Sequence, residues 1–339
     1  MRYLIGRLVL LIGTFWAAIT IDFLIPRLMP SNPAADMLAR FEQNGDFLPP
    51  SAQHALSVML GISHQGLLGQ YGTFLLQVIH FNFGRSYTYF PYTVTSEIFR
   101  ALPWTLVLIG VTTLLSFALG TGLGVLAAWR RGSRLDSWVT PSAMFTSAFP
   151  YFWLAMALLY VFAYLVHWFP LGGNYSSTLS TGLSFTFVGS VVYHALLPAL
   201  TILVSSIGGW LLSMRNNMLT TLHEDYIVLA QAKGLSNAKV ALGYAARNAI
   251  LPNFTGFAMA LGFVVGGSLL VEVVFAYPGM GYLLYNAAIN QDYPLLEGIF
   301  VIIVACVLLA NFLADLIYFV LDPRIRRSLS GGIRHGRSQ

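Results

Sequence analysis

The hydrophobic positions of this chain gather into six long windows, which predict helices that cross a membrane. The windows are residues 8–25, 103–128, 139–166, 193–214, 253–276 and 296–321. Each has roughly the 20 residues that a helix needs to span the hydrocarbon core. A backbone exposed to lipid must satisfy its own hydrogen bonds, and a helix does so within one segment. The predicted fold class is therefore all-α, a polytopic membrane protein with about six transmembrane helices.

The composition excludes a soluble globular protein. Hydrophobic residues make up 57% of the 339 residues and charged residues only 9%, and the mean hydropathy is +0.70. These values leave too few polar side chains to cover a soluble surface. The single cysteine, Cys306, can form no disulfide within the chain. The first window follows Arg2 and Arg7 but contains Asp22 and has no small-x-small cleavage site, so we expect an uncleaved first helix.

The basic residues predict the orientation of the chain. Four of the 18 Lys and Arg residues, Arg27, Arg40, Arg85 and Arg100, lie between the first and second windows. The other 14 lie at the N-terminus, in the second-to-third and fourth-to-fifth connections, and in the tail. Because cytoplasmic segments are enriched in Lys and Arg, both termini are expected in the cytoplasm.

The segments between the windows predict the domain organisation. Residues 1–29 contain the first transmembrane helix, and residues 30–101 form an extracytoplasmic loop or cap with helical stretches near 53–60 and 70–81. Residues 102–328 form a core of five transmembrane helices with a cytoplasmic connection at 215–252, and residues 329–339 are a basic cytoplasmic tail.

The cytoplasmic connection contains the signals of a short, self-contained helix. Asp225 is a good N-cap residue, and Glu224 places a negative charge at the positive end of the helix. Lys233 places a positive charge in the last turn, and Gly234 suits a left-handed C-cap. A helix of about two turns is therefore expected, followed by a second, amphipathic stretch at 237–249 that leads into the fifth window.

The side chains of this short helix suit contact with a partner. Tyr226, Ile227, Leu229 and Leu235 offer apolar contacts, whereas Ala230 and Ala232 keep part of the surface small. A short solvated loop does not keep such residues exposed without a reason, so the helix is predicted to lie in a groove of a partner protein. An interfacial helix lying along anionic headgroups is the alternative.

Several runs of residues, taken in this order, resemble one known family. They are Ile5-Gly6-Arg7-Leu8, Pro30-Ser31-Asn32-Pro33-Ala34, Phe83-Gly84-Arg85-Ser86, Leu102-Pro103-Trp104-Thr105-Leu106, Ala230-Gln231-Ala232-Lys233-Gly234-Leu235-Ser236, Ala246-Arg247-Asn248-Ala249-Ile250-Leu251-Pro252, Tyr277-Pro278-Gly279-Met280-Gly281, Asn290-Gln291-Asp292-Tyr293-Pro294 and Asp322-Pro323-Arg324. The chain resembles, over nearly its whole length, the permeases of ATP-binding-cassette importers of the dipeptide, oligopeptide and nickel branch. Val228-Leu229-Ala230 stands where other branches have Glu-Ala-Ala, and Ser31-Asn32-Pro33 where the family has Gly-Asp-Pro.

The resemblance implies a type I importer permease fold and a set of partners. A homologous second permease would complete the translocation path, two ATP-binding-cassette ATPases would hydrolyse ATP, and an extracytoplasmic solute-binding protein would deliver the solute. ATP and Mg would bind those ATPase subunits, and no cofactor is expected on this chain. Membrane lipid is also an expected partner, and nucleic acid is not. Peptides are the expected solute, with oligosaccharides or nickel as alternatives.

The resemblance also assigns the short helix the role of a coupling helix. Closure of the ATPase dimer would push this helix and rock the bundle from inward-open to outward-open. The residues expected to couple this chain to the ATPase are Glu224, Asp225, Tyr226, Ala230, Ala232, Lys233, Gly234 and Leu235.

The fourth window contains candidates for the translocation path. Ser205, Ser206, Gly208 and Gly209 could line a wide polar path, and packing inside the bundle is an equal alternative. Close helix packing is also expected at two small-residue pairs, Gly120 with Gly124 and Gly262 with Gly266.

An enzyme and an ion-coupled transporter are the main competing interpretations of this sequence. The chain has no phosphate-binding G-x-x-x-x-G-K-[ST] loop, because Lys233 and Lys239 both follow alanine, and it has neither H-E-x-x-H nor G-x-S-x-G. An ion-coupled secondary transporter would use acids inside the membrane, and Asp22, Glu272 and Asp315 are the candidates. Position near a boundary, or pairing with a helix end, is the favoured interpretation of Glu272 and Asp315.

Overall fold

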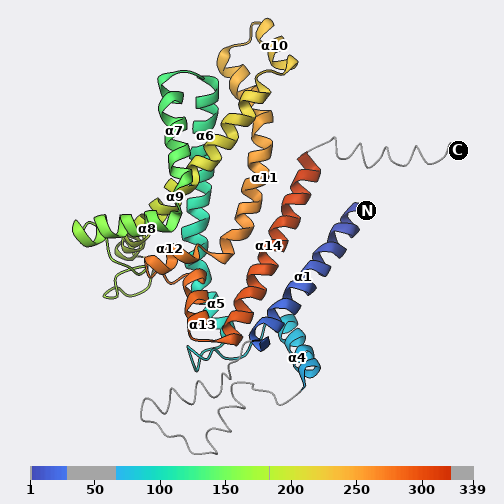
Figure 1. The fold of residues 1–339 in the computed structure, drawn as a ribbon, viewed down its shortest axis with the longest axis vertical. Coiled ribbons are helices and arrows are strands. Elements are labelled where there is room, and N and C mark those ends of the chain that lie inside the picture. Colours follow the sequence, from blue (N-terminus) through green and yellow to red (C-terminus); the bar gives the residue numbers. More distant parts are fainter. Residues whose placement is uncertain (1, 29–65, 183, 322–339) are drawn as a thin grey trace, which may run out of the picture. The chain divides into compact units, whose positions relative to one another are not determined.

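The structure, a computed structural model, describes residues 2–28, 66–182 and 184–321 (Figure 1). These residues form helices joined by turns, and none of them lies in a β-strand, which confirms the all-α prediction for the described part of the chain. The predicted helical stretch at 53–60 and the basic tail at 329–339 lie outside the described residues.

The helices follow one another closely along the chain. In order they are α1 (Arg2–Leu28), α4 (Leu67–His80), α5 (Val94–Thr105), α6 (Val111–Trp129), α7 (Arg134–Ala148), α8 (Tyr151–Leu158), α9 (Phe185–Thr221), α10 (Asp225–Ala232), α11 (Arg247–Phe263), α12 (Leu269–Val274), α13 (Met280–Ile289) and α14 (Tyr293–Leu321). Short π-helical segments at Leu106–Gly110, Leu159–Leu165 and Lys239–Ala246 and a 3₁₀ turn at Val264–Gly266 extend these helices. Helix α4 confirms the stretch expected near 70–81.

Five helical stretches of the described chain are long and apolar enough to cross a membrane. They are Gly6–Leu28, Val94–Trp129, Phe185–Thr221, Lys239–Gly266 and Tyr293–Leu313. The third predicted window is instead a bent pair of helices, broken at Phe149 and Pro150, and the count rises to six if the pair forms one span. The break has a local cause, because Pro150 disfavours helical backbone at the residue before it, and Phe149 is extended.

The fifth predicted window was wrong at its C-terminal end. The span begins earlier than expected, at Lys239, so the stretch at 237–249 lies largely within the same continuous helix. It ends at Gly266, because Gly267 has a φ of +72° and turns the chain out of the helix. Residues 269–274 then form the separate short helix α12.

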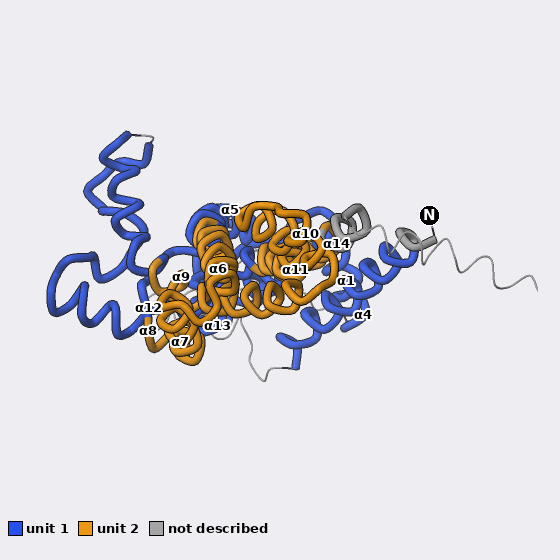
Figure 2. The backbone as a smooth tube through the Cα atoms, turned by 90° about the horizontal axis from the view of Figure 1, so that it is seen from above, with its two compact units in different colours: residues 1–110, 155–199, 264–305 blue, residues 111–154, 200–263, 306–339 orange. Residues whose placement is uncertain are grey.

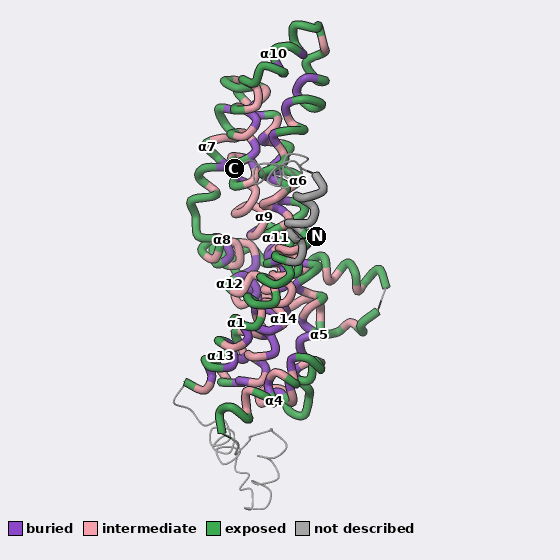
Figure 3. Tube along the Cα trace, turned by 90° about the vertical axis from the view of Figure 1, so that its right-hand side faces the viewer, coloured by how far each residue is buried: buried purple, intermediate pink, exposed green. Residues whose placement is uncertain are grey.

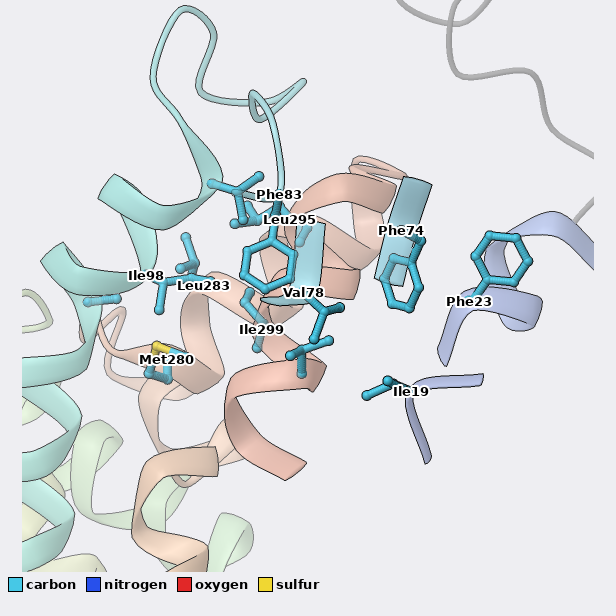
Figure 4. Close-up of a cluster of buried hydrophobic side chains, with 14 residues drawn as sticks. Ile19, Phe23, Phe74, Val78, Phe83, Ile98, Met280, Leu283, Leu295 and Ile299 are labelled. Carbon is cyan, nitrogen blue, oxygen red and sulfur yellow. The ribbon is translucent and has the colours of Figure 1, made fainter. Parts of the chain in front are cut away.

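The chain divides into two compact units, each with its own core (Figure 2). Unit 1 comprises residues 1–110, 155–199 and 264–305, and unit 2 comprises residues 111–154, 200–263 and 306–339. The core of unit 1 gathers apolar side chains from α1, α4, α5, α13 and α14 (Figure 4). One hydrophobic cluster of unit 2 lies at α10. It contains apolar side chains of α6, α9 and α10 and of the helix that begins at Lys239.

Glycines let two helices of unit 2 approach closely. A Cβ atom built on Gly120 would lie 2.7 Å from the carbonyl oxygen of Ile207, and one on Gly124 would lie 2.6 Å from that of Leu211. A Cβ on Gly262 would lie 2.7 Å from the Cβ of Ala310 on α14, whereas Gly266 is in ordinary contact distance. The close packing predicted from these pairs is therefore confirmed at three of the four positions.

Candidate functional site

Helix α10 is the short helix predicted in the connection between the fourth and fifth spans. It begins at Asp225, so that Glu224 is the N-cap residue, and the side chain of Glu224 makes no capping hydrogen bond. The prediction that Asp225 is the N-cap was wrong by one position. Asp225 instead lies in the first turn, where its charge still opposes the positive end of the helix.

The C-terminal end of α10 is a Schellman motif. Gly234 has a φ of +74°, its N–H donates to the carbonyl of Gln231 at 2.9 Å, and the N–H of Leu235 donates to the carbonyl of Ala230 at 3.4 Å. This pair of bonds, from the second and first residues after the cap, is the pattern that defines the motif. The left-handed glycine predicted at position 234 is confirmed.

One face of α10 is held within the chain. Ile227 is 0% exposed, Ala230 is buried, and both pack in the cluster that includes Met214 and Met218 of α9. Leu235 packs against the same cluster. Ala230 is thus part of the internal packing, and a bulky residue there would disturb the unit 2 core as well as any contact with a partner.

The residues of α10 opposite Ile227 and Ala230 are exposed, and Figure 3 colours exposed residues green along the backbone. Asp225, Val228, Leu229 and Ala232 are spaced by three, one and three residues, which places them on one side of a helix. Val228 is 57% exposed and Leu229 is 55% exposed. The predicted residues Glu224, Tyr226, Lys233 and Gly234 are also exposed, and the Tyr226 hydroxyl accepts a hydrogen bond from Asn248 Nδ2 at 2.9 Å. We call Asp225, Val228, Leu229 and Ala232 the outward face.

An ion pair that the sequence pattern did not predict connects the first turn of α7 with α9. Arg215 donates to Asp136 from Nε to Oδ1 at 2.8 Å and from Nη2 to Oδ2 at 3.0 Å. Asp136 also accepts from the N–H of Gly132 at 3.1 Å and from the Thr140 hydroxyl at 2.7 Å. Two parallel charged bonds fix both distance and orientation. The distribution of Lys and Arg predicts only the side of the membrane on which Arg215 lies. The sequence spacing does not identify Asp136, 79 residues away, as its partner.

A buried asparagine joins three helices of unit 2 near the same cluster. The Asn253 Oδ1 accepts from the Ser213 hydroxyl at 2.6 Å and from Asn217 at 3.4 Å. Its Nδ2 donates to the Trp210 carbonyl at 3.1 Å and to the Thr121 hydroxyl at 3.4 Å. All four hydrogen-bonding positions of the amide are used. The helix that follows α10 is thereby held to α6 and α9, and the only sequence signal was a polar residue inside a predicted span.

The four path candidates on α9 face different ways. Ser206 donates to the Ser116 hydroxyl of α6 at 2.9 Å, and Gly208 is buried against Ala143 of α7. Ser205 donates to carbonyls of its own helix, and no atom lies within 4 Å of a Cβ built on Gly209. Only Ser205 and Gly209, four residues apart, share a side of α9 that is not packed on α6 or α7 within unit 2.

Glu272 of unit 1 is paired with a helix end. Its Oε2 accepts from the N–H groups of Gly281 at 2.7 Å and Tyr282 at 3.1 Å, in the first turn of α13. Its Oε1 accepts from the Thr105 hydroxyl at 2.9 Å. The carboxylate thus caps α13 from another element. The interpretation of Glu272 as a helix-end partner is confirmed, whereas the side chain of Asp315 lies outside the described residues.

Comparison with known proteins adds the family. The pattern of the family described as "Binding-protein-dependent transport system inner membrane component" matches residues 120–327. The oligopeptide transport system permease protein AppB of Bacillus subtilis is 34% identical over 76% of this chain and 79% of the relative. The di/tripeptide transport system permease protein DppB of Pseudomonas aeruginosa is 31% identical, and the oligopeptide transport system permease protein OppB of Haemophilus influenzae is 29% identical, each over 96% of this chain and 99% of the relative.

These matches and the apolar helices agree with the resemblance found in the sequence. No group of three or more His, Cys, Asp or Glu residues that could hold a metal ion occurs in the described part of the chain. The family is a component of transport systems, and its description places it in the inner membrane. The chain therefore belongs to the inner-membrane components of binding-protein-dependent transport systems, as a multi-pass permease of the ATP-binding-cassette importer type.

Proposed function

We propose that this chain is the permease subunit of a peptide importer and pairs with a homologous second permease to form the translocation path. Two ATPase subunits, which bind ATP and Mg, drive transport, and an extracytoplasmic binding protein delivers the peptide. The names of relatives that cover nearly the whole chain support peptides as the solute. The distribution of Lys and Arg supports cytoplasmic termini.

The observation that best supports coupling to an ATPase is the division of α10 into two faces. Ile227 and Ala230 fix the helix to α9 and to the helix beginning at Lys239, so a push on α10 is transmitted to two spans. Val228 and Leu229 remain exposed beside Ala232, and such a small apolar surface fits a groove on a partner. We assign the outward face, with the exposed Glu224, Tyr226 and Lys233 at its margins, to the ATPase. Gly234 and Leu235 set the end of the helix.

We place the path on the Ser205 and Gly209 side of α9. Ser206 and Gly208 hold α9 against α6 and α7, so they support the wall of the path.

A pair of substitutions on α10 tests the coupling assignment. Leu229→Asp puts a charge on the outward face, whereas Gln231→Asp puts the same charge on an exposed position beside it. We expect Leu229→Asp to reduce the free energy of ATPase binding by about 2 kcal/mol or more, which is typical of a residue at the centre of an interface. Less ATPase should then co-purify with this variant. Gln231→Asp should retain co-purification and transport. Equal retention by both variants would refute the docking of the outward face.

The energy source separates the proposal from an ion-coupled transporter. Peptide uptake into vesicles that contain the assembled transporter should continue when the proton gradient is collapsed and stop when ATP is removed. Uptake that follows the gradient and ignores ATP would refute the proposal.

A further inference from the structure

Helix α4 has one buried face and a separate apolar stripe that is exposed. Phe74 and Val78 are buried in the unit 1 core. Leu68, Leu76 and Ile79 lie on another side of the helix, together with Gly72, at spacings of four, four and three residues. Leu68 is 88% exposed, Leu76 is 58% exposed and Ile79 is 70% exposed. We call these four residues the aliphatic stripe.

A polar stripe runs beside the aliphatic stripe. Gln70, Thr73, Gln77 and His80 are spaced by three, four and three residues, so they also share one side of α4. None of the residues Leu67–His80 is Asp, Glu, Lys or Arg. A helix with adjacent apolar and polar sides is typical of one that lies in the plane of a membrane surface. Without charges, its position would depend on buried apolar area and not on anionic lipid.

The contacts between α4 and α1 place α4 at the depth of lipid. The Tyr71 and Thr20 hydroxyls are 2.7 Å apart, and Gln70 Oε1 accepts from Arg27 Nε at 3.1 Å. The ring of Phe23 lies 5.1 Å from that of Tyr71 (Figure 4 shows Phe23 near Phe74). Thr20 is eight residues before the end of the span Gly6–Leu28, which corresponds to about 12 Å along the helix axis. Since half of the hydrocarbon core is about 15 Å thick, α4 lies beside the membrane-embedded part of α1.

The exposed surface of α1 over the same turns is also apolar. Ile21, Leu24, Ile25 and Leu28 are exposed large hydrophobic residues. The aliphatic stripe and this part of the membrane span therefore both present large aliphatic side chains to their surroundings. Helix contacts between proteins in membranes favour small residues, whereas three of the four residues of the stripe are large aliphatic residues, which favours lipid as the occupant.

We propose that α4 is an interfacial helix, with the aliphatic stripe among acyl chains and the polar stripe at the headgroups. It anchors the end of α1 in one leaflet, which is the outer leaflet in the orientation proposed above. Lateral load on this end of the bundle is then borne by lipid as well as by the unit 1 core.

Collision of a spin label with oxygen and with a water-soluble nickel chelate measures this directly. Cys306→Ala provides the background, into which Leu76→Cys and the matched control Thr73→Cys are introduced separately. Both variants are labelled in the assembled transporter, in vesicles of phosphatidylethanolamine and phosphatidylglycerol. We expect the ratio of oxygen to nickel collisions to be several-fold higher at position 76 than at position 73. Ile79→Cys with Gln77→Cys repeats the comparison if the first pair does not assemble.

Two results would overturn the proposal. Nickel collisions as frequent at position 76 as at position 73 would place the stripe in water. A label at position 76 that is immobile and reached by neither reagent would mean that protein covers the stripe, as in contact with a partner permease.

Discussion

Two short helices, α10 in unit 2 and α13 in unit 1, each depend on glycine at one end. They differ in the contacts that their other residues make. Gly234 ends α10, and the face opposite Ile227 is exposed. Gly279 and Gly281 begin α13, and a Cβ atom on Gly279 would lie 2.6 Å from the carboxylate carbon of Glu272. Met280, Leu283 and other side chains of α13 are buried.

The difference separates a helix end that serves the fold from the helix to which we assign docking. At α13 the Glu272 carboxylate and its three hydrogen-bond donors are satisfied within unit 1, so this end of the helix contributes to the stability of unit 1. At α10 only one face is packed internally, and the outward face is exposed among the described residues of unit 2. Substitutions should therefore affect stability at α13 and partner binding at the outward face of α10.

Removal of the Glu272 carboxylate should give the largest loss of stability. Glu272→Leu leaves the N–H groups of Gly281 and Tyr282 and the Thr105 hydroxyl without their acceptor, and we expect a loss of about 4 kcal/mol. Glu272→Gln keeps an acceptor oxygen and should lose about half as much. Thermal unfolding of the detergent-solubilised protein measures both, and equal unfolding midpoints for Glu272→Leu and the parent would contradict the capping role.

The Asp136–Arg215 ion pair should give the next largest effect. Asp136→Ala leaves Arg215 without both of its carboxylate bonds in a partly buried site, and we expect a loss of about 2 kcal/mol. Thr140→Val removes only one hydroxyl bond to the same carboxylate and should cost less than about 1 kcal/mol. The two variants are compared by thermal unfolding, and a reversed order would show that the ion pair does not connect α7 with α9 as described.

Gly234 should show a smaller effect, set by its backbone conformation. Gly234→Ala places a Cβ on a residue with a φ of +74°, which costs about 1 kcal/mol. Asparagine tolerates this conformation better, so Gly234→Asn should recover part of the stability and of ATPase co-purification. A Gly234→Asn variant that is worse than Gly234→Ala in both assays would argue that position 234 contacts the partner directly.

The smallest expected effect has the opposite sign. The Tyr277 hydroxyl is buried and has no hydrogen-bond partner among the described residues, and burial, followed by the Glu272 carboxylate, raises the pKa of Tyr277 above its usual value. Tyr277→Phe removes an unsatisfied hydroxyl, so we expect the free energy of unfolding to stay equal or to rise by up to about 1 kcal/mol. Unfolding at neutral pH tests this, and a clear loss of stability would show that the hydroxyl has a partner.

The sequence predicted the elements whose signals are local. Hydrophobic windows gave the spans, because a helix must be apolar along its whole length to cross lipid. Gly234 predicted the end of α10, and the paired glycines predicted close helix packing. Both predictions depend only on a glycine and its immediate sequence neighbours. The resemblance to importer permeases came from several such local motifs in order.

The features that hydropathy did not predict are of two kinds, local breaks inside apolar windows and contacts between distant residues. The break at Pro150 and the end of the fifth span at Gly266 interrupt windows that hydropathy alone counts as continuous. The partners of Arg215, Asn253 and Glu272 lie on other helices, and periodicity contains no information about which side chain meets them. Ile227 and Leu229 have similar hydrophobicity, yet only the packing against Met214 and Met218 shows which one faces inward.

Photocrosslinking from position 229 tests the docking of α10 most directly. A photoreactive phenylalanine derivative replaces Leu229 in the transporter expressed in its native membrane, with the same derivative at Gln231 as the control. The account predicts an adduct with the ATPase subunit from position 229 and much less from position 231. Adducts only with lipid from position 229, or labelling of that position by a reagent confined to the outside of the cell, would contradict it.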